Sequence, residues 1–143
     1  MTRHIIVAEP PASYRVRQPM VVDCSVLAAA LFDEPERDVA TRRLSGAHLY
    51  APYLLDFEIA SVALKKARHG LAEVAALALA DYQALRLERV RVEPDVQVEL
   101  AARYDLTTYD AAYLWLAAEL KAPLATFDQR LGDAARRHLD ALG

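Results

Sequence analysis

The chain has 143 residues, a mass of 15.9 kDa and a net charge of −3 at pH 7, a length that predicts a single domain. Hydrophobic residues make up 55% and charged residues 26%, which provides enough apolar surface for one core and excludes a disordered or low-complexity chain. The single cysteine, Cys24, excludes an internal disulfide framework, and the acidic balance excludes a globally basic nucleic-acid binder while leaving room for a local basic patch.

Apolar segments too short for a membrane span indicate a protein of the cytoplasm. No stretch approaches the ~18 consecutive apolar residues that cross a bilayer. A short apolar run near the start is stopped by Glu9, Pro10 and Pro11, so it lacks the length of a secretory signal. A lone cysteine is also typical of a reducing compartment. We therefore expect a cytoplasmic protein without a membrane segment.

Short apolar runs alternate with helical patterns after an atypical first segment. Residues 1–19 are rich in proline and poor in acids, so we interpret them as an N-terminal arm or as a stretch that precedes a start at Met20. From there we predict, in chain order, a strand at 20–22, helices at 25–32 and 36–44, a strand at 48–51, helices at 53–69 and 71–87, a strand at 90–92, a helix opened by Pro94, a helix at 107–121, a strand at 124–126 and a helix at 129–139.

This alternation predicts an α/β domain over residues 20–143, with a mostly parallel sheet and helices on both of its faces. Such sheets place their functional residues at the carboxyl ends of the strands, near the topological switch point. Asp23 follows the first predicted strand, and Asp128 follows the last. Each of these acids is equally well placed to cap the helix that comes next.

Two further acids lie on predicted helices. Asp110 comes three residues after Thr107, in the arrangement of a capping box, where an acid also benefits from the positive end of the helix dipole. Glu58 lies in an otherwise apolar helix and has no cation three or four residues further on. It belongs either to a narrow solvated stripe or to the wall of a polar site. Asp56 points about 200° away on the same helix, so the two acids do not form a pair.

Convergence of these four acids would require a counter-charge. Two carboxylates ~5 Å apart repel each other by roughly 3 kcal/mol at an effective dielectric constant of ~20. Several such pairs would rival the ~5–15 kcal/mol that stabilises a whole domain. Oxygen ligands select hard ions such as Mg²⁺ or Mn²⁺. Zinc is disfavoured, because the sequence lacks paired histidine spacing and we expect each histidine at the surface; these residues are His4, His48, His69 and His138.

Four segments that contain these acids resemble the motifs of PIN domains, in the order and spacing of the bacterial VapC-like toxins. The segments are residues 20–27 (MVVDCSVL), 56–62 (DFEIASV), 106–114 (LTTYDAAYL) and 126–131 (TFDQRL). The resemblance covers the chain from Met20 to about Leu139. It implies a short parallel sheet of about four to five strands between helices. The 19-residue lead departs from the family pattern, and the short tail after His138 leaves little room for a final edge strand.

The resemblance also implies an activity: ribonuclease with Mg²⁺ or Mn²⁺ as cofactor, acting as the toxin of a type II toxin–antitoxin pair. Asp23 and Asp110 would be the principal metal ligands, and Glu58 and Asp128 would complete the acidic site. It further implies a small antitoxin as partner, a homodimer, and a structured RNA such as tRNA or ribosomal RNA as substrate. We expect hydrolysis of the phosphodiester by metal-activated water, because no protein nucleophile is apparent.

Auxiliary roles are expected for residues near the acids. Ser25 and Thr126 match polar positions that assist through hydrogen bonds. Lys65, Lys66 and Arg68 cluster at the end of the predicted helix that carries Glu58, where they would contact phosphates or simply form a solvated surface. A second cluster of arginines follows the next helix: Arg86, Arg89 and Arg91. The apolar helices at 53–69 and 71–87 are either protein–protein interfaces or ordinary core helices.

Other functions stay open at this point. A PIN-domain nuclease of RNA processing would share the same acids without being a toxin. A binding module without catalysis is disfavoured by four intact acids. A receiver-like signalling module would have a second acid beside the first and an acceptor aspartate after the third strand, but the sequence has Cys24 and Ser25 after Asp23. An antitoxin encoded next to the gene would separate the toxin from the processing enzyme.

Overall fold

The centre of the fold is a sheet of four parallel strands, counted over residues 17–142, which the computed structural model describes. The strands are β1 (Pro19–Val22), β2 (His48–Pro52), β3 (Leu87–Val90) and β4 (Leu124–Ala125). They lie in the order β3-β2-β1-β4, and every neighbouring pair is parallel. The predicted parallel sheet is therefore confirmed. Residues 1–16, which make up most of the predicted arm, lie outside the described part of the chain.

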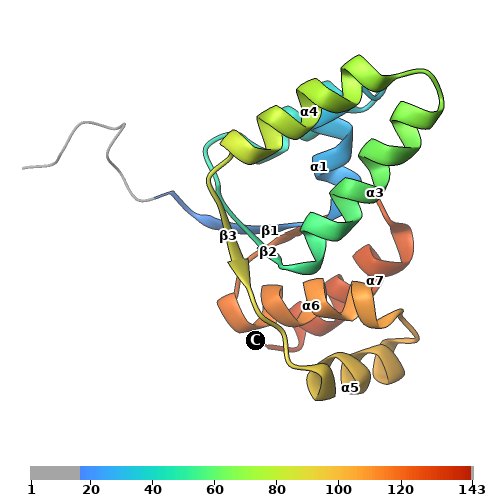
Figure 1. Ribbon diagram of the computed structural model, residues 1–143. Helices are drawn as coiled ribbons and strands as arrows, with labels where there is room; N and C mark the ends of the chain where they lie inside the picture. The colour runs from blue at the N-terminus through green and yellow to red at the C-terminus, as the bar shows by residue number, and fades with distance from the viewer. Residues whose placement is uncertain (1–16, 143) are drawn as a thin grey trace, which may run out of the picture.

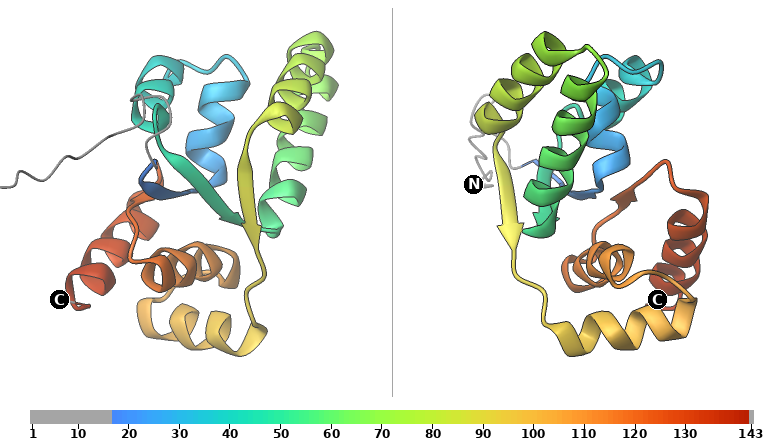
Figure 2. Two further views of the ribbon diagram at one scale, coloured as in Figure 1. Left: turned by 90° about the vertical axis from the view of Figure 1, so that its left-hand side faces the viewer. Right: turned by 45° about the vertical axis from the view of Figure 1, so that its right-hand side comes forward.

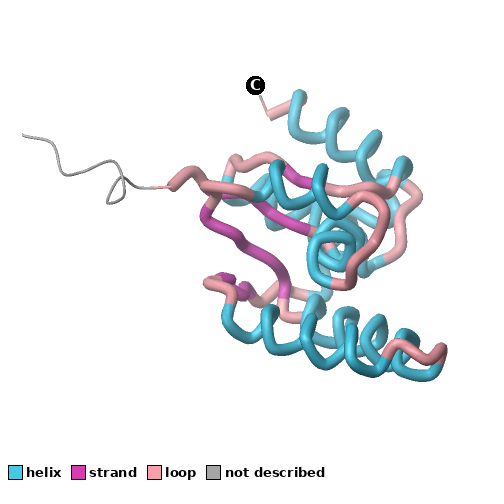
Figure 3. The backbone as a smooth tube through the Cα atoms, turned by 90° about the horizontal axis from the view of Figure 1, so that it is seen from above, coloured by secondary structure: helices cyan, strands magenta, loops and turns pink. Residues whose placement is uncertain are grey.

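Helices cover both faces of this sheet. They are α1 (Cys24–Leu31), α2 (Arg37–Leu44), α3 (Leu54–Arg68), α4 (Ala72–Ala84), α5 (Pro94–Tyr104), α6 (Thr108–Leu120) and α7 (Gln129–Asp140). In Figure 1, α1, α3 and α4 lie above the strands, and α5, α6 and α7 lie below them. Figure 2 shows α2 beside α1 in the upper layer, and Figure 3 shows the strands between the helices from above. The architecture is the predicted α/β arrangement with a layer on each face.

Helix α6 is the most deeply buried helix of the lower layer. It packs against β1, β2 and β4, and the side chains of Tyr113, Leu114 and Leu116 are at most 1% exposed. Burial of a leucine side chain contributes roughly 1.5–3 kcal/mol. The helix begins where the Thr107 side chain accepts a hydrogen bond from the backbone N–H of Asp110. The core thus fixes the first turn of α6, which carries Asp110, relative to the sheet.

The third strand differs from the prediction. We predicted a helix at 71–87 and a strand at 90–92, but α4 ends at Ala84 and β3 spans Leu87–Val90. Buried Leu87 lies opposite Leu49 of β2, so the strand begins there. The alanine-rich helix has no glycine or proline to mark its end. The strand also contains Glu88 and Arg89, which an edge strand tolerates because one of its sides faces solvent.

The two apolar helices, α3 and α4, each bury one face and expose apolar residues on another. Leu55, Ile59 and Ala63 of α3 lie in the core. In contrast, Phe57 is 76% exposed and Leu77 of α4 is 69% exposed. Each helix therefore contributes to the core, and its exposed apolar residues leave the predicted protein–protein interface as a prediction. No helix among residues 17–142 is long and apolar enough to cross a bilayer.

A three-residue interaction joins α3, α4 and β3 on the far side of α3 from Glu58. The Asp56 carboxylate accepts hydrogen bonds from Arg89 Nε at 2.9 and 3.0 Å and from the Tyr82 hydroxyl at 2.5 Å. Tyr82 is buried, at 5% exposed. Asp56 and Glu58 therefore serve different neighbours, which confirms that they do not form a pair. Arg89, one of the predicted cluster of arginines, stabilises the fold through this ion pair.

We predict that Asp56→Asn lowers the free energy of unfolding by about 1–2 kcal/mol, because the ion pair with Arg89 is lost and asparagine offers one acceptor oxygen in place of two. Urea unfolding followed by circular dichroism measures this change. Glu119→Gln is the matched control, since Glu119 is exposed on α6 and forms no ion pair with any described residue. Equal stability of the two variants would contradict the assigned role of Asp56.

Candidate active site

Asp23 lies at the carboxyl end of the central strand β1 and is fixed there by three hydrogen bonds. It caps α1, since Oδ1 accepts the backbone N–H of Val26 at 3.2 Å. The same oxygen accepts the Ser25 hydroxyl at 2.6 Å, and Oδ2 accepts the Thr126 hydroxyl. Asp23 is 6% exposed and is the one buried charged residue among residues 17–142. Its capping role therefore accounts for only one of these contacts.

The loop after β4 is tied to Asp23 through the same two hydroxyls. Ser25 Oγ accepts the backbone N–H of Phe127 at 2.9 Å, and Thr126 Oγ1 accepts the backbone N–H of Asp128 at 2.9 Å. Asp128 itself caps α7, because its Oδ1 accepts the N–H of Leu131 at 2.9 Å. The segment that carries Asp128 is thereby held beside the end of β1. Ser25 and Thr126, which the sequence suggested as auxiliary residues, make these connections.

Glu58 reaches the site from α3 and is held from the opposite layer. The Tyr113 hydroxyl of α6 donates a hydrogen bond to Glu58 Oε1 at 2.6 Å. Sequence reasoning did not single out Tyr113, because a tyrosine in an apolar helix is usually a core residue. The sequence nevertheless contains a pattern that indicates a place near the acids. Tyr113 follows Asp110 by three residues, so the two side chains lie on the same face of α6.

Asp23, Glu58 and Asp110 each lie close enough to another of the predicted acids for its negative charge to raise their pKa. Burial raises the pKa of Asp23, and the negative charge of Asp128 adds to this, although the hydroxyls of Ser25 and Thr126 work against it. Burial likewise raises the pKa of Asp110, and the charges of Asp128 and Asp23 raise it further. The structure therefore brings acids from three separate segments of the chain together.

The carboxyl of Glu58 behaves in the same way. Burial raises its pKa, the Tyr113 hydrogen bond lowers it, and the charges of Asp110 and Asp23 raise it again. The Cys24 thiol lies in the same negative field: burial, then Glu58 and Asp23, raise its pKa to about 12, so it stays protonated at neutral pH. The site thus has excess negative charge that its own hydrogen bonds offset only in part.

Comparison with known proteins assigns the chain to a family. A model of the PIN domain family matches residues 20–137. The chain belongs to the PIN-domain family. It is 33% identical over 120 residues to Ribonuclease VapC9 of Mycobacterium tuberculosis, covering 82% of this chain and 91% of that protein. It is 31% identical over 121 residues to Ribonuclease VapC3 of Pyrobaculum aerophilum, covering 80% of this chain and 92% of that protein.

A solved structure agrees with this fold. The crystal structure of PAE2754 from Pyrobaculum aerophilum matches with a TM-score of 0.65 and 22% identity, over 87% of this chain and 89% of that chain. At this identity the match supports the PIN fold alone. The four acids of this chain lie on the fold as the resemblance implied: after β1, on α3, at the start of α6 and after β4.

The acidic site of this PIN domain fits a hard divalent cation by the chemistry of its donors. None of the four carboxylates forms an ion pair with a cationic side chain among residues 17–142. Within those residues no group of three or more His, Cys, Asp or Glu side chains is arranged so that it could hold a metal ion. Mg²⁺ typically keeps several waters and uses only one or two carboxylates, so an open carboxylate site suits it. The donor set excludes zinc, which prefers nitrogen and sulfur.

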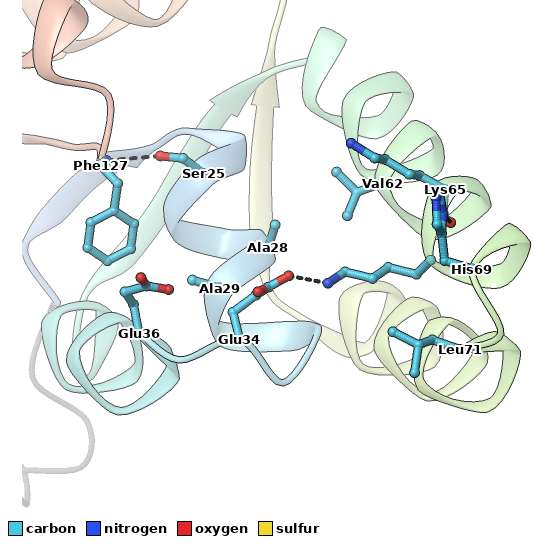
Figure 4. Close-up of a pocket in the computed structure, with 11 residues that line it drawn as sticks. Ser25, Ala28, Ala29, Glu34, Glu36, Val62, Lys65, His69, Leu71 and Phe127 are labelled. Atoms are coloured by element: carbon cyan, nitrogen blue, oxygen red, sulfur yellow. Dashed lines mark hydrogen bonds and ion pairs between the residues drawn. The ribbon is translucent and has the colours of Figure 1, made fainter.

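The basic residues at the end of α3 divide into two groups. Lys66 forms an ion pair with Glu34, across a cavity of about 730 Å³ that Ser25 and Phe127 also line (Figure 4). Lys65 and Arg68 are exposed, and neither forms an ion pair with a described residue. The long-range partner of Lys66 was not foreseen, and it leaves less positive charge for RNA than the sequence suggested.

Histidines contribute nothing to the acidic site within the described residues. His69 is exposed, and its Nδ1 lies 2.7 Å from the backbone oxygen of Lys65. His48 lies 3.6 Å from Glu88, and His138 lies 2.7 Å from the Tyr104 hydroxyl. Both are partly exposed, which agrees with the expectation of surface histidines. His4 lies outside the described residues.

We predict that Glu58→Gln stabilises the metal-free protein at pH 7. Glutamine still accepts the Tyr113 hydrogen bond but removes one negative charge, so relief of about 1 kcal/mol would raise the melting temperature by roughly 2–4 °C. The raised pKa of Glu58 means that its charge costs stability as pH rises through that value. Near pH 4, below the ordinary glutamate pKa of 4.5, the carboxyl is mostly protonated in both folded and unfolded states and the gain should shrink.

Calorimetry of both proteins at pH 4 and pH 7, with a chelator present, measures this difference. Glu119→Gln serves again as the charge-matched control and should change the melting temperature little at either pH. A Glu58→Gln variant that melts below the wild type at pH 7, or gains equally at both pH values, would show that Glu58 experiences no repulsion.

Proposed function

We propose that this PIN domain is a Mg²⁺- or Mn²⁺-dependent endoribonuclease that acts as the toxin of a type II toxin–antitoxin pair. The observation that carries the proposal is the group of carboxylates near the ends of β1 and β4 that pair with no cationic side chain among residues 17–142. The names of the relatives support RNA as the substrate, since both are called ribonucleases. We expect the protein to act in the cytoplasm, where RNA and a newly made antitoxin are both present.

Each acid has a role in the proposed site. Asp23 and Asp110 are the principal ligands of the cation, and Glu58 and Asp128 complete the acidic site. When bound, the cation activates a water molecule, binds a phosphate oxygen and stabilises the leaving oxygen. Ser25 and Thr126 keep both oxygens of Asp23 oriented, and their hydrogen bonds favour its ionised form. Hydrolysis in this manner leaves 5′-phosphate and 3′-hydroxyl ends on the RNA.

We predict that the purified protein cleaves RNA with added Mg²⁺ or Mn²⁺ and that EDTA stops the reaction. Asp110→Asn keeps the shape of the side chain and the start of α6, so it should lower the rate at least 100-fold through loss of a ligand. Mapping the cut sites in total RNA gives both the activity and the substrate. Glu119→Gln, on the same helix but outside the site, should cleave like the wild type.

Full activity of Asp110→Asn, or cleavage that persists in EDTA, would contradict the metal-dependent mechanism. To exclude a contaminating nuclease, wild type and variants are purified in parallel, and the activity must follow the variant across the column fractions.

RNA binding needs positive charge that an acidic chain supplies only locally. Lys65 and Arg68 are exposed at the end of the helix that carries Glu58. We propose that they contact phosphates beside the site. Lys66 is less suited, because Glu34 already neutralises it.

We predict that the double variant Lys65→Ala and Arg68→Ala binds RNA more weakly and with a flatter salt dependence. Each lost phosphate contact removes roughly 0.7 from the slope of log K against log salt for a single strand. Fluorescence anisotropy in the inactive Asp110→Asn background, over a series of KCl concentrations, measures the slope. Arg42→Ala and Arg43→Ala on α2 remove the same charge elsewhere. Equal slopes for the two pairs would assign Lys65 and Arg68 to the solvated surface.

Exposed apolar side chains on α3 and α4 are the candidate surfaces for protein partners. A homodimer and an antitoxin complex are both supported by exposed apolar side chains, Phe57 and Leu64 on α3 and Leu77 on α4. The alternative is a PIN nuclease of RNA processing without an antitoxin. Co-expression decides between them, since only a toxin is relieved by a small protein encoded beside it. Membership of the PIN family removes support for a receiver-like module.

A further inference from the structure

The contact between Tyr113 and Glu58 connects helices that lie on opposite faces of the sheet. Glu58 lies on α3, above the strands in Figure 1, and Tyr113 lies on α6, below them. Their 2.6 Å hydrogen bond is the one side-chain hydrogen bond that joins these two helices within residues 17–142. It therefore reaches from the layer that carries Asp110 to the layer that carries Glu58.

The geometry makes this hydrogen bond a precise constraint. Tyr113 is 1% exposed, so its ring is held on all sides by the core and its hydroxyl has little freedom to move. The hydroxyl contacts Oε1 of Glu58, whereas Oε2 accepts no hydrogen bond from the described residues. One oxygen is thus fixed and the other is left available. A mid-helix glutamate has several rotatable bonds, and without this contact its carboxylate would adopt other positions.

We propose that Tyr113 is a positioning residue, whose hydroxyl holds the Glu58 carboxylate in the orientation that binds the divalent cation. The inference rests on the proposed function, because it requires that the acidic site binds such an ion. Outer contacts of this kind orient metal ligands in proteins generally, and their loss typically costs 10- to 100-fold in affinity or activity. Tyr113 differs from Ser25 and Thr126 in that it acts on Glu58 rather than on Asp23.

The structure contains a matched control for this role. Tyr82 is also buried, at 5% exposed, and its hydroxyl also donates to a carboxylate, that of Asp56 at 2.5 Å. Asp56 lies outside the acidic site and pairs with Arg89. Removal of either hydroxyl leaves a buried ring in place and one carboxylate with a lost hydrogen bond. Tyr82→Phe therefore reproduces the structural cost of Tyr113→Phe without the proposed effect on the metal site.

Calorimetric titration of the purified full chain with Mn²⁺ tests the proposal without using activity. We expect Tyr113→Phe to weaken Mn²⁺ binding about 10-fold and Tyr82→Phe to leave it unchanged. Near-wild-type affinity in Tyr113→Phe would overturn the proposal. An equal loss of Mn²⁺ affinity in both tyrosine variants would also overturn the proposal, because the loss would then come from lower stability of the protein in general. A wild type that binds no Mn²⁺ at this site would overturn the proposed function as well.

A double-mutant cycle separates positioning from any other effect of Tyr113. If Tyr113 acts through Glu58, then Tyr113→Phe should change Mn²⁺ affinity less than 2-fold when Glu58→Gln is already present. A further 10-fold loss in that background would show that Tyr113 acts by another route. If Tyr113→Phe alone folds poorly, the comparison of Glu58→Gln with the double variant still tests the proposal, because Glu58→Gln removes the charge that the hydroxyl stabilises.

Discussion

The placement of several carboxylates in one partly buried site is the constraint on which the rest of this structure depends. Asp23 is buried, and the pKa values of Asp23, Glu58 and Asp110 are all raised, chiefly by burial and further by the charges of neighbouring acids, Asp128 included. A fold selected only for stability would place cations beside such groups, as it does for Asp56 and Glu34. Within the described residues no cationic side chain pairs with these acids, which is the observation that motivates the proposed divalent cation.

The remaining elements hold these charges in place without neutralising them. Parallel strands end at the same edge of the sheet, so residues after β1 and β4 meet although they are far apart in the chain. Hydroxyl groups then orient the oxygens, from Ser25 and Thr126 on Asp23 and from Tyr113 on Glu58. Neutral donors favour the ionised form of each acid, but they leave the net charge for a metal ion to offset. In the proposed function, a bound metal ion would offset the charge that lowers the stability of the metal-free site.

The sequence predicted the parallel sheet, the order of its elements and the elements that carry the four acids, because short apolar strands and helical spacing are local patterns. It did not predict contacts that depend on packing. The strand after α4 begins at Leu87 rather than Val90, because its register is set by β2 and not by its own apolar residues. Similarly, Lys66 is neutralised by Glu34, and Tyr113 combines a core position with a polar contact, neither of which any local spacing reveals.

The central claim is that the acids form one site for a divalent ion, and a crystal structure of the wild-type protein soaked in Mn²⁺ tests it most directly. Anomalous diffraction identifies manganese independently of its surroundings. The account predicts an anomalous peak about 2.1 Å from carboxylate oxygens of at least two of the acids, Asp23 and Asp110 among them. A fully occupied manganese ion elsewhere, with none between these carboxylates, would contradict it.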